Sequence, residues 1–306
     1  MSLQAEGLTL SEGREERGLP YDVWSQVVDE HGVLRLAPAR RFFLPLTQEK
    51  LPLLMEVYEA WRDYHEYMVL AGSNRETGEK AFVAVKCSKR GNDIYARRMK
   101  ERLDFLEQLS DVEFFDNVDF TKQAYARSNL LWVTLTWDSN FCSLDEAWRM
   151  SYYYLHKFKA NLENRFGKVE WLVFPQPFPD REGKAFGYPH FHILLLFKEA
   201  SFNAFPHMEL DEDGKTVMRF RVREKREIEV QGKWHSFVDV QAISSPRKAA
   251  AYCKRYAMNE CYGSGEKATL TCAVNWLYRK QGYSLTHHFR EDLHEFIVSM
   301  QLRKTV

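Results

Sequence analysis

The sequence is poor in cysteine, and its cysteines form no metal-binding or redox pattern. Five occur in 306 residues, and none of them belongs to a C-x-x-C pair. This spacing excludes a zinc ribbon and a thioredoxin-type motif. The odd, irregular set favours a reducing compartment, so we expect a cytoplasmic protein.

Long apolar runs and a nucleotide-binding loop are also missing. No segment approaches the ~18 consecutive apolar residues of a membrane helix, and residues 1–20 lack the apolar run of a secretory signal. We therefore expect no membrane partner. The pattern G-x-x-x-x-G-K-[ST] does not occur either, which excludes a recognisable P-loop ATPase domain.

The chain has no excess of either charge sign. Lys and Arg together number 43, as do Asp and Glu, so the formal net charge is zero. This balance excludes a globally basic nucleic-acid binder, but it allows a local basic face. Aromatic residues are plentiful, with 21 Phe, 15 Tyr and 8 Trp. Such side chains build large cores, and exposed ones stack on nucleic-acid bases.

Mixed periodicities predict an α+β fold in which helices flank a central antiparallel sheet. β-branched and aromatic runs predict strands at 81–87, 130–137, 170–174, 189–197 and 237–241, with a charged hairpin at 217–231. Amphipathic spacing and capping residues predict helices at 48–67, 92–109, 143–166, 246–259, 268–280 and 289–301. We expect a flexible tail at 1–20, a mainly helical extension or subdomain at 21–80, the core domain at 81–262 and a C-terminal helical extension at 263–306.

Two histidines lie two residues apart in the segment GYPHFHILLLF, residues 187–197. On a strand, His190 and His192 face the same side, while Phe191 and Ile193 point into the core. Two imidazoles on one face can chelate a divalent cation and leave further coordination positions open. The alternative interpretation is a pair of surface histidines on the open face of a sheet.

Two tyrosines lie four residues apart in SSPRKAAAYCKRYAMNE, residues 244–260, which starts with a capping serine and a proline. On a helix, Tyr252 and Tyr256 share one face, with Lys248 and Arg255 close to it. A tyrosine hydroxyl has a pKa of ~10, so it acts as a nucleophile only where a metal-bound phosphate or nearby cations assist it. The alternative is ordinary helix packing.

The order of these motifs resembles that of the HUH-superfamily endonucleases, and within them the rolling-circle replication initiator (Rep) proteins of plasmids and viruses. LLWVTLTW (130–137) is similar to the family's first motif, GYPHFHILLLF to its second and AAYCKRYAM (250–258) to its third. NWLYRKQGYSLTHHF (275–289) and, more weakly, VKCSKRGNDIYARR (85–98) are similar to segments of some plasmid Rep proteins. The resemblance extends over residues 80–290.

The resemblance implies an HUH nuclease core with an RRM-like sheet at 81–262, and a divalent metal ion, Mn²⁺ or Mg²⁺. His190 and His192 are the implied metal ligands. The family commonly takes its third ligand from the strand before the second motif. For that ligand Gln176 is our first choice, and Glu182, on the following loop, is the second.

The resemblance also implies roles for the residues of the third motif. Tyr252 is the implied nucleophile, forming a covalent 5′-phosphotyrosine and a free 3′-OH. Tyr256 is either a second nucleophile or a structural tyrosine. The family's motif lysine is replaced here by Arg255, to which we assign phosphate binding, with Lys254 as the alternative.

Local basic stretches are the expected contacts for single-stranded DNA. Seven basic residues and two acidic ones lie between 86 and 102, and three arginines alternate at 219–223. Such faces can follow a phosphate backbone. The alternative for the first stretch is a solvated charged helix, and the alternative for the arginines is pairing with Glu224, Glu227 and Glu229. The expected DNA-binding residues are Lys86, Lys89, Arg90, Arg97, Arg98, Arg219, Arg221, Arg223 and Lys248.

The implied function is metal-dependent, site-specific nicking and rejoining of single-stranded DNA at a replication origin, by a protein that a plasmid or virus encodes. Because the chain has no P-loop, we expect a separate helicase as partner. Three alternatives stay open. They are a transposase or mobilisation relaxase of the same superfamily, a non-catalytic DNA-binding regulator, and a metal-dependent hydrolase that uses water.

Overall fold

The computed structural model describes residues 24–28, 34–38, 40–64, 67–106, 115, 119, 121–122, 125–210, 214–261 and 265–304, without the side chains of 24–28, 34–38, 246, 255, 258–261 and 300–304. The chain divides into two compact units, Met1–Phe42 and Phe43–Val306. The tail predicted at 1–20 lies outside the described residues. All candidate site residues belong to the second unit.

The region 21–80 is richer in strands than the sequence predicts. In the first unit, β1 (Trp24–Val28) and β2 (Leu34–Pro38) form an antiparallel hairpin. The 3-10 turns η2 (Arg40–Phe43) and η3 (Gln48–Lys50) precede the helix α1 (Leu51–Asp63). A second hairpin, β3 (Tyr67–Ser73) with β4 (Lys80–Lys86), follows. The segment therefore contains two hairpins beside the predicted helix, and the sequence did not predict them.

The second hairpin does not join the central sheet. The strand predicted at 81–87 is confirmed as β4, but its partner is β3, and both strands are exposed along almost their whole length. The helix α2 (Asp93–Leu103) comes next, capped by the Asn92 side chain, which accepts a hydrogen bond from the Tyr95 amide at 2.9 Å. The 3-10 turn η4 (Asp104–Leu106) continues it.

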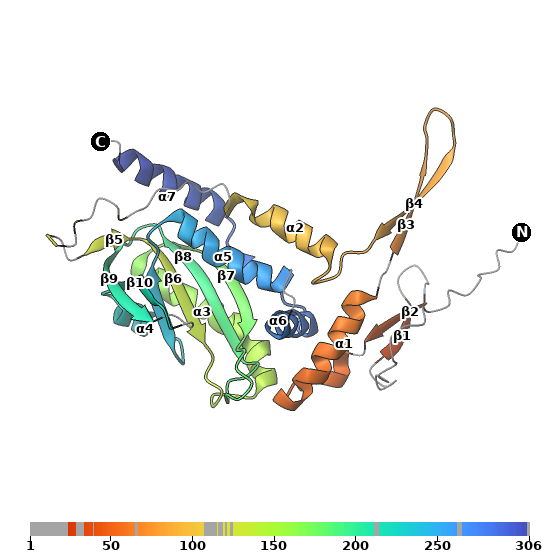
Figure 1. The fold of residues 1–306 in the computed structure, drawn as a ribbon, viewed down its shortest axis with the longest axis horizontal. Helices are drawn as coiled ribbons and strands as arrows, with labels where there is room; N and C mark the ends of the chain where they lie inside the picture. The colour runs from red at the N-terminus through yellow and green to blue at the C-terminus, as the bar shows by residue number, and fades with distance from the viewer. Residues whose placement is uncertain are drawn as a thin grey trace, which may run out of the picture. The chain divides into compact units, whose positions relative to one another are not determined.

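Eight strands form one antiparallel sheet in the order β12-β7-β8-β6-β11-β10-β9-β5 (Figure 1). This sheet, flanked by helices, confirms the α+β class. In chain order the strands are β5 (Ala126–Ser128), β6 (Leu130–Thr136), β7 (Val169–Pro177), β8 (Pro189–Phe197), β9 (Phe202–Leu210), β10 (Thr216–Val222), β11 (Val238–Ala242) and β12 (Ser284–Leu285).

The hairpin predicted at 217–231 is wrong. β10 pairs with β9, and the residues after it form the helix α4 (Lys225–Gly232). This helix buries Ile228 and places Lys225 one turn before Glu229, with 3.6 Å between their charged groups. On a helix, residues four positions apart lie close together on one face, so Lys225 can pair with Glu229 while Ile228 is buried. On an extended strand the same two charged groups would lie too far apart to pair.

Helices cover both faces of the sheet. On β7, Trp171 contacts His156 of α3 (Leu144–Phe166), whereas Phe174 contacts Tyr256 of α5 (Pro246–Cys261). Residues an odd number of positions apart on a strand face opposite sides, so α3 and α5 lie on opposite faces of the sheet. In the described part of the chain, no helix is both long and apolar enough to cross a membrane.

Both ends of α3 lie where the sequence predicts them. Ser143 and Glu146 form a reciprocal capping box at its N-terminus, and Gly167 ends it with a φ of 80°, a conformation that favours glycine. The face toward the sheet buries Trp148, Leu155 and other large apolar side chains. α3 therefore packs against the face of the sheet opposite to the one that α5 covers.

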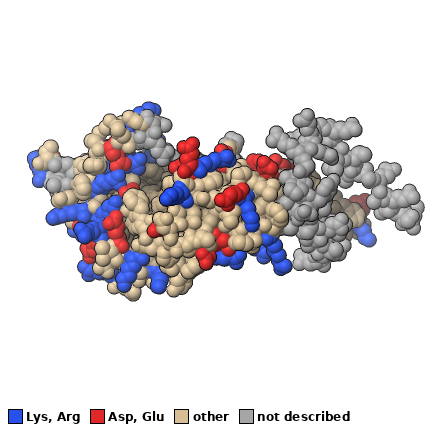
Figure 2. All heavy atoms as spheres, turned by 90° about the horizontal axis from the view of Figure 1, so that it is seen from below, with Lys and Arg blue, Asp and Glu red and all other residues tan. Residues whose placement is uncertain are grey.

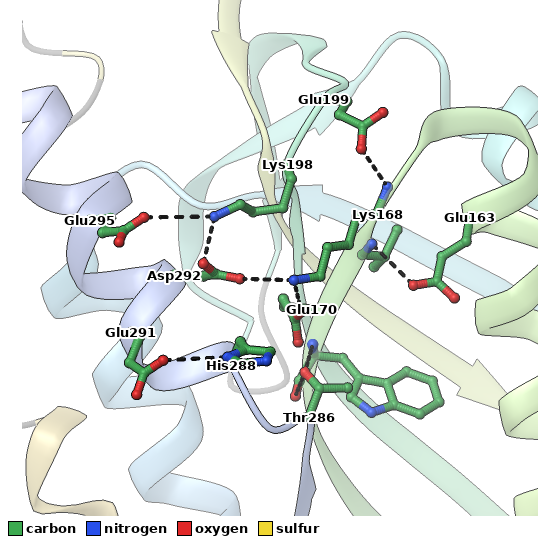
Figure 3. Close-up of polar contacts among 12 residues, drawn as sticks. Glu163, Lys168, Glu170, Lys198, Glu199, Thr286, His288, Glu291, Asp292 and Glu295 are labelled. Atoms are coloured by element: carbon green, nitrogen blue, oxygen red, sulfur yellow. Dashed lines mark hydrogen bonds and ion pairs between the residues drawn. The ribbon is translucent and has the colours of Figure 1, made fainter.

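The C-terminal helices α6 (Glu266–Leu277) and α7 (Phe289–Lys304) are part of the same unit as the sheet. Both pack against β7, and β12 between them pairs with β7. Figure 3 shows the charged cluster that holds α7. Asp292 accepts from Lys198 at 2.5 Å and lies 3.7 Å from Lys168, which also pairs with Glu170 at 2.9 Å.

We expect Asp145→Asn to lower the free energy of unfolding by about 2–3 kcal/mol. The buried Asp145 carboxylate accepts bonds from the Leu46 amide (3.2 Å), Arg149 Nε (2.6 Å) and the Tyr278 hydroxyl (2.7 Å). It therefore joins three distant segments of the unit. Chemical denaturation measures the change, with Glu182→Gln, on an exposed loop, as the control.

The same carboxylate predicts a pH dependence. Burial alone would raise the pKa of Asp145, but the bonds from Arg149, Tyr278 and Leu46 outweigh it and lower the pKa. The stabilisation is thus complete above the ordinary aspartate pKa of ~3.9 and is lost as the pH falls through the lowered value. An Asp145→Asn variant whose stability equals that of the parent at pH 7 would contradict this role.

Candidate functional site

Gln176, His190 and Thr136 form a row across three neighbouring strands. On β8, His190 lies directly opposite Gln176 of β7 and opposite Thr136 of β6. Residues opposite each other in antiparallel strands have side chains on the same face. The next row holds His192 opposite Thr134. Both histidines and the first-choice third ligand therefore share the face that α5 covers.

The entry into β8 is fixed by Gly187 and its neighbours. Gly187 has a φ of 80°, and its carbonyl accepts a hydrogen bond from the Trp148 indole at 2.8 Å. A Cβ at this position would lie 2.5 Å from a methyl carbon of Leu51. The glycine of GYPHFHILLLF is thus required by both backbone conformation and space, and it sets the start of the strand that carries the histidines.

Threonine hydroxyls orient both imidazoles. Thr136 Oγ1 lies 3.1 Å from His190 Nδ1, and Thr134 Oγ1 lies 3.4 Å from His192 Nδ1. In the tautomer in which Nδ1 carries the proton, each imidazole donates to its threonine and keeps the Nε2 lone pair. This is the arrangement in which second-shell partners fix metal-binding histidines.

Both imidazoles are neutral near pH 7. Burial, and to a smaller extent the charge of Lys267, lowers the pKa of His190 to about 4. Burial lowers the pKa of His192 well below its ordinary value, with further contributions from His190 and Lys267. Because a metal binds the neutral imidazole, this environment leaves the pair ready for a cation without a proton having to leave.

Lys267 lies at this end of the sheet because α6 is anchored beside it. Asn275 of α6 donates to the Pro175 carbonyl of β7 at 3.3 Å, next to Gln176. Glu266, at the start of α6, pairs with Arg181 of the loop that connects β7 to β8. Lys267 is exposed, and its effect on the pKa of both histidines indicates that its charge lies close to them.

The donor set suits a divalent cation with open coordination positions. Two neutral imidazoles and the amide of Gln176, which is 3% exposed, would leave the positive charge of such an ion uncancelled. Among the described residues, no three or more His, Cys, Asp or Glu side chains form a metal-binding group. Glu182, the second choice, lies exposed on the β7–β8 loop, where its amide donates to Asp180.

The two tyrosines reach the histidines from α5. Ser245 caps this helix by accepting from the Lys248 amide at 3.1 Å. The ring of Tyr256 stacks on His192 with a centroid distance of 3.7 Å and an interplanar angle of 23°. Tyr252 and Tyr256 both stack on Trp132, at 5.3 Å and 5.4 Å. The tyrosine face of α5 is thus directed at the sheet, above the histidine pair.

The basic residues of the third motif are placed differently from one another. Lys254 lies on the exposed side of α5, as do Arg247 and Ala251, so its ammonium is not on the tyrosine face. The backbone of Arg255 is part of α5, and its side chain lies outside the described residues. Among the described residues, Lys267 of α6 is a cation that lies near the histidines. It lies outside the third motif, so the motif did not identify it.

The first basic stretch is only partly at the surface. Arg97 and Arg98 are exposed on α2, which packs against α5. Lys89 is 5% exposed, and its ammonium donates to the carbonyls of Trp61 and Tyr64. This burial corrects the expectation that Lys89 faces DNA. Arg90 donates to the Lys280 carbonyl, and Lys86 pairs with Asp93 at 2.8 Å.

The arginine ladder on β10 is largely engaged within the protein. Arg219 lies 2.5 Å from Glu209, and Arg221 pairs with both Glu209 and Asp239. Arg223 is exposed, with its guanidinium 5.2 Å from the ring centre of Tyr125. Lys248 is exposed on α5, where its ammonium donates to Ser244. The exposed members of the expected set are thus Arg97, Arg98, Arg223 and Lys248.

Figure 2 shows how charge is distributed on one face of the molecule. Lys and Arg are interspersed there with Asp and Glu, and the basic groups gather toward the end at which β9, β10 and α4 lie.

Two further residues lie beside the candidate site and were not singled out from the sequence. The side chain of Trp132, on β6, lies between the sheet and α5. Its ring stacks on His192 with a centroid distance of 5.9 Å and also stacks on the two tyrosines. Phe237 precedes β11, and its carbonyl accepts from the Thr136 amide at 3.1 Å. Strand alternation alone places Trp132 and Thr134 on one face, so that signal was present in the sequence, whereas Phe237 required the register of β6 with β11.

Comparison of the sequence with protein-family models finds no match, and comparisons with curated proteins and with solved structures find none either.

Proposed function

We propose that this chain is a metal-dependent endonuclease that nicks and rejoins single-stranded DNA through a covalent phosphotyrosine. The observation that carries the proposal is the stack of Tyr256 on His192 at 3.7 Å, with both tyrosines of α5 on Trp132. Candidate nucleophiles from one element therefore lie against candidate metal ligands from another. The similarity of the three motifs to HUH endonucleases supports the same reaction.

His190, His192 and Gln176 would hold the metal ion. When bound, the ion supplies positive charge to a non-bridging oxygen of the scissile phosphate. The chain's own contribution is to present neutral donors, oriented by Thr134 and Thr136, in a largely buried setting. Lys267 adds a second positive charge near the phosphate.

The reaction exchanges one phosphodiester for another. The hydroxyl of Tyr252 loses its proton, and its oxygen forms a bond to the phosphorus while the bond from phosphorus to the 3′-oxygen breaks. The 3′-oxygen takes up a proton, which leaves a free 3′-OH and a 5′-phosphotyrosine. Rejoining is the reverse attack by a 3′-OH, so no ATP is consumed. Tyr256, one turn further along α5, serves the second cleavage.

Rolling-circle replication is the process that uses this chemistry in the family the motifs resemble. A nick at an origin gives a 3′-OH primer, and the attached protein retains the energy needed to close the displaced strand. The sequence contains no P-loop, so the proposal assigns strand separation to a separate helicase.

The test is a search for the covalent intermediate. Labelled single-stranded DNA carrying candidate nick sites is incubated with the protein and Mn²⁺ and then run on a denaturing gel. We expect a slower, protease-sensitive band that EDTA abolishes. Multiple turnover without an adduct would instead indicate hydrolysis by water. Tight binding without any cleavage would favour the non-catalytic regulator.

A further inference from the structure

An exposed aromatic ring continues the row of candidate site residues. The Thr136 amide donates to the Phe237 carbonyl at 3.1 Å, and Leu135 lies opposite Val238, so the register places Phe237 opposite Thr136. The row therefore runs from Gln176 through His190 and Thr136 to Phe237. Two inter-strand spacings, about 10 Å, separate the backbones of His190 and Phe237.

The ring lies on the same side of the sheet as the histidines. Asp239, two residues after Phe237, lies opposite Thr134, which is on the histidine face. The ammonium of Lys225 is 3.7 Å from the Asp239 carboxylate and 5.5 Å from the ring centre of Phe237. One cation thus touches both side chains, which agrees with their alternation along the strand.

Neighbouring aromatics at this end of the sheet are packed against one another, and Phe237 is not. Trp137, Phe141 and Trp234 surround His235 with centroid distances between 4.3 Å and 4.7 Å. Phe237 is 60% exposed, and in the described part of the chain its ring pairs with no other aromatic ring. An aromatic face beside a cation, open to solvent, has the composition of a base-stacking site.

We propose that Phe237 stacks on a base of single-stranded DNA next to the phosphate that lies at the histidines. This inference rests on the proposed function and adds to it a binding subsite for a nucleobase. Lys225 strengthens the platform by its charge, although it also pairs with Glu229 and Asp239. A stack of this kind fixes the position of the strand without reading its sequence, because every base has a π face.

The experiment distinguishes binding of the nucleobase from binding of the sugar-phosphate backbone. Fluorescence anisotropy in EDTA measures the affinity of the full chain for labelled oligothymidylate and for an abasic oligomer of the same length. The variants are Phe237→Ala and Phe237→Trp, with Tyr153→Ala as the control. Tyr153 is 59% exposed but lies on α3, beneath the opposite face of the sheet.

We expect Phe237→Ala to weaken oligothymidylate binding about 5- to 100-fold, with unchanged affinity for the abasic oligomer. Phe237→Trp and Tyr153→Ala should bind as the parent does. Unchanged oligothymidylate affinity in Phe237→Ala, an equal loss on the abasic oligomer, or a parent that binds no single strand would overturn the subsite. If the parent forms no tyrosyl adduct but the base-dependent loss is seen, the subsite stands and the nuclease proposal fails.

Discussion

Tyr252→Phe is expected to abolish the covalent protein–DNA adduct, with a loss of about a thousandfold or more. The substitution removes only the hydroxyl oxygen that would bond to phosphorus. The ring, which stacks on Trp132 at 5.3 Å, is retained, so α5 should keep its place on the sheet. The measurement is the rate of adduct formation on single-stranded DNA with Mn²⁺, together with the melting temperature of each variant.

Tyr256→Phe is the matched variant, because it removes the same atom one helical turn away. It should still form the first adduct but should lose second cleavage and rejoining. The reverse pattern, with the adduct lost only in Tyr256→Phe, would exchange the two roles. That outcome is worth testing because the Tyr256 ring is the one in contact with His192. An adduct that survives in the double variant would rule out both tyrosines as nucleophiles.

His190→Ala is expected to lower metal-dependent adduct formation by at least a hundredfold. The imidazole is one of three donors, and the other two, on His192 and Gln176, cannot by themselves enclose the ion. Isothermal titration with Mn²⁺ should show a matching loss of affinity. Thr136→Val removes the hydroxyl that lies 3.1 Å from His190 Nδ1 while keeping the side-chain shape, and it should cost about 10- to 100-fold.

The control for both variants is oligothymidylate binding in EDTA. It should not change, because His190 is proposed to act on the phosphate only through the metal ion, and Thr136 only orients His190. If His190→Ala keeps full adduct formation, the histidine pair is a structural element and the metal site is wrong. If only Thr136→Val behaves as the parent does, the imidazole holds its orientation without that hydroxyl.

Those parts of the site that depend on local pattern could be predicted from the sequence. Strand alternation placed His190 and His192 on one face, and helical spacing placed Tyr252 and Tyr256 together. The capping box at Ser143 gave the start of α3 correctly. In each case the physical cause acts over a few residues, so a short segment contains the information.

Features that depend on distant partners could not be predicted. Lys89 belongs to a basic stretch, yet Trp61 and Tyr64 bury it by accepting its hydrogen bonds. β9 was not predicted as a strand, because Pro206 lies inside it and proline is disfavoured within strands, but pairing with β10 fixes it. The arginines of β10 find Glu209 and Asp239 on adjacent strands. Register between strands decides these cases, and no local periodicity encodes it.

The row that joins Gln176, His190 and Thr136 also determines when the site comes into being during synthesis. β7 and β8 are neighbours in sequence and pair early, but Thr136 and His190 are 54 residues apart, a contact that forms slowly. The tyrosines of α5 follow seven of the eight strands along the chain. A nascent chain therefore has both imidazoles before it has either phenol. The hydroxyls meet the histidines only when the ribosome has released almost the whole sheet.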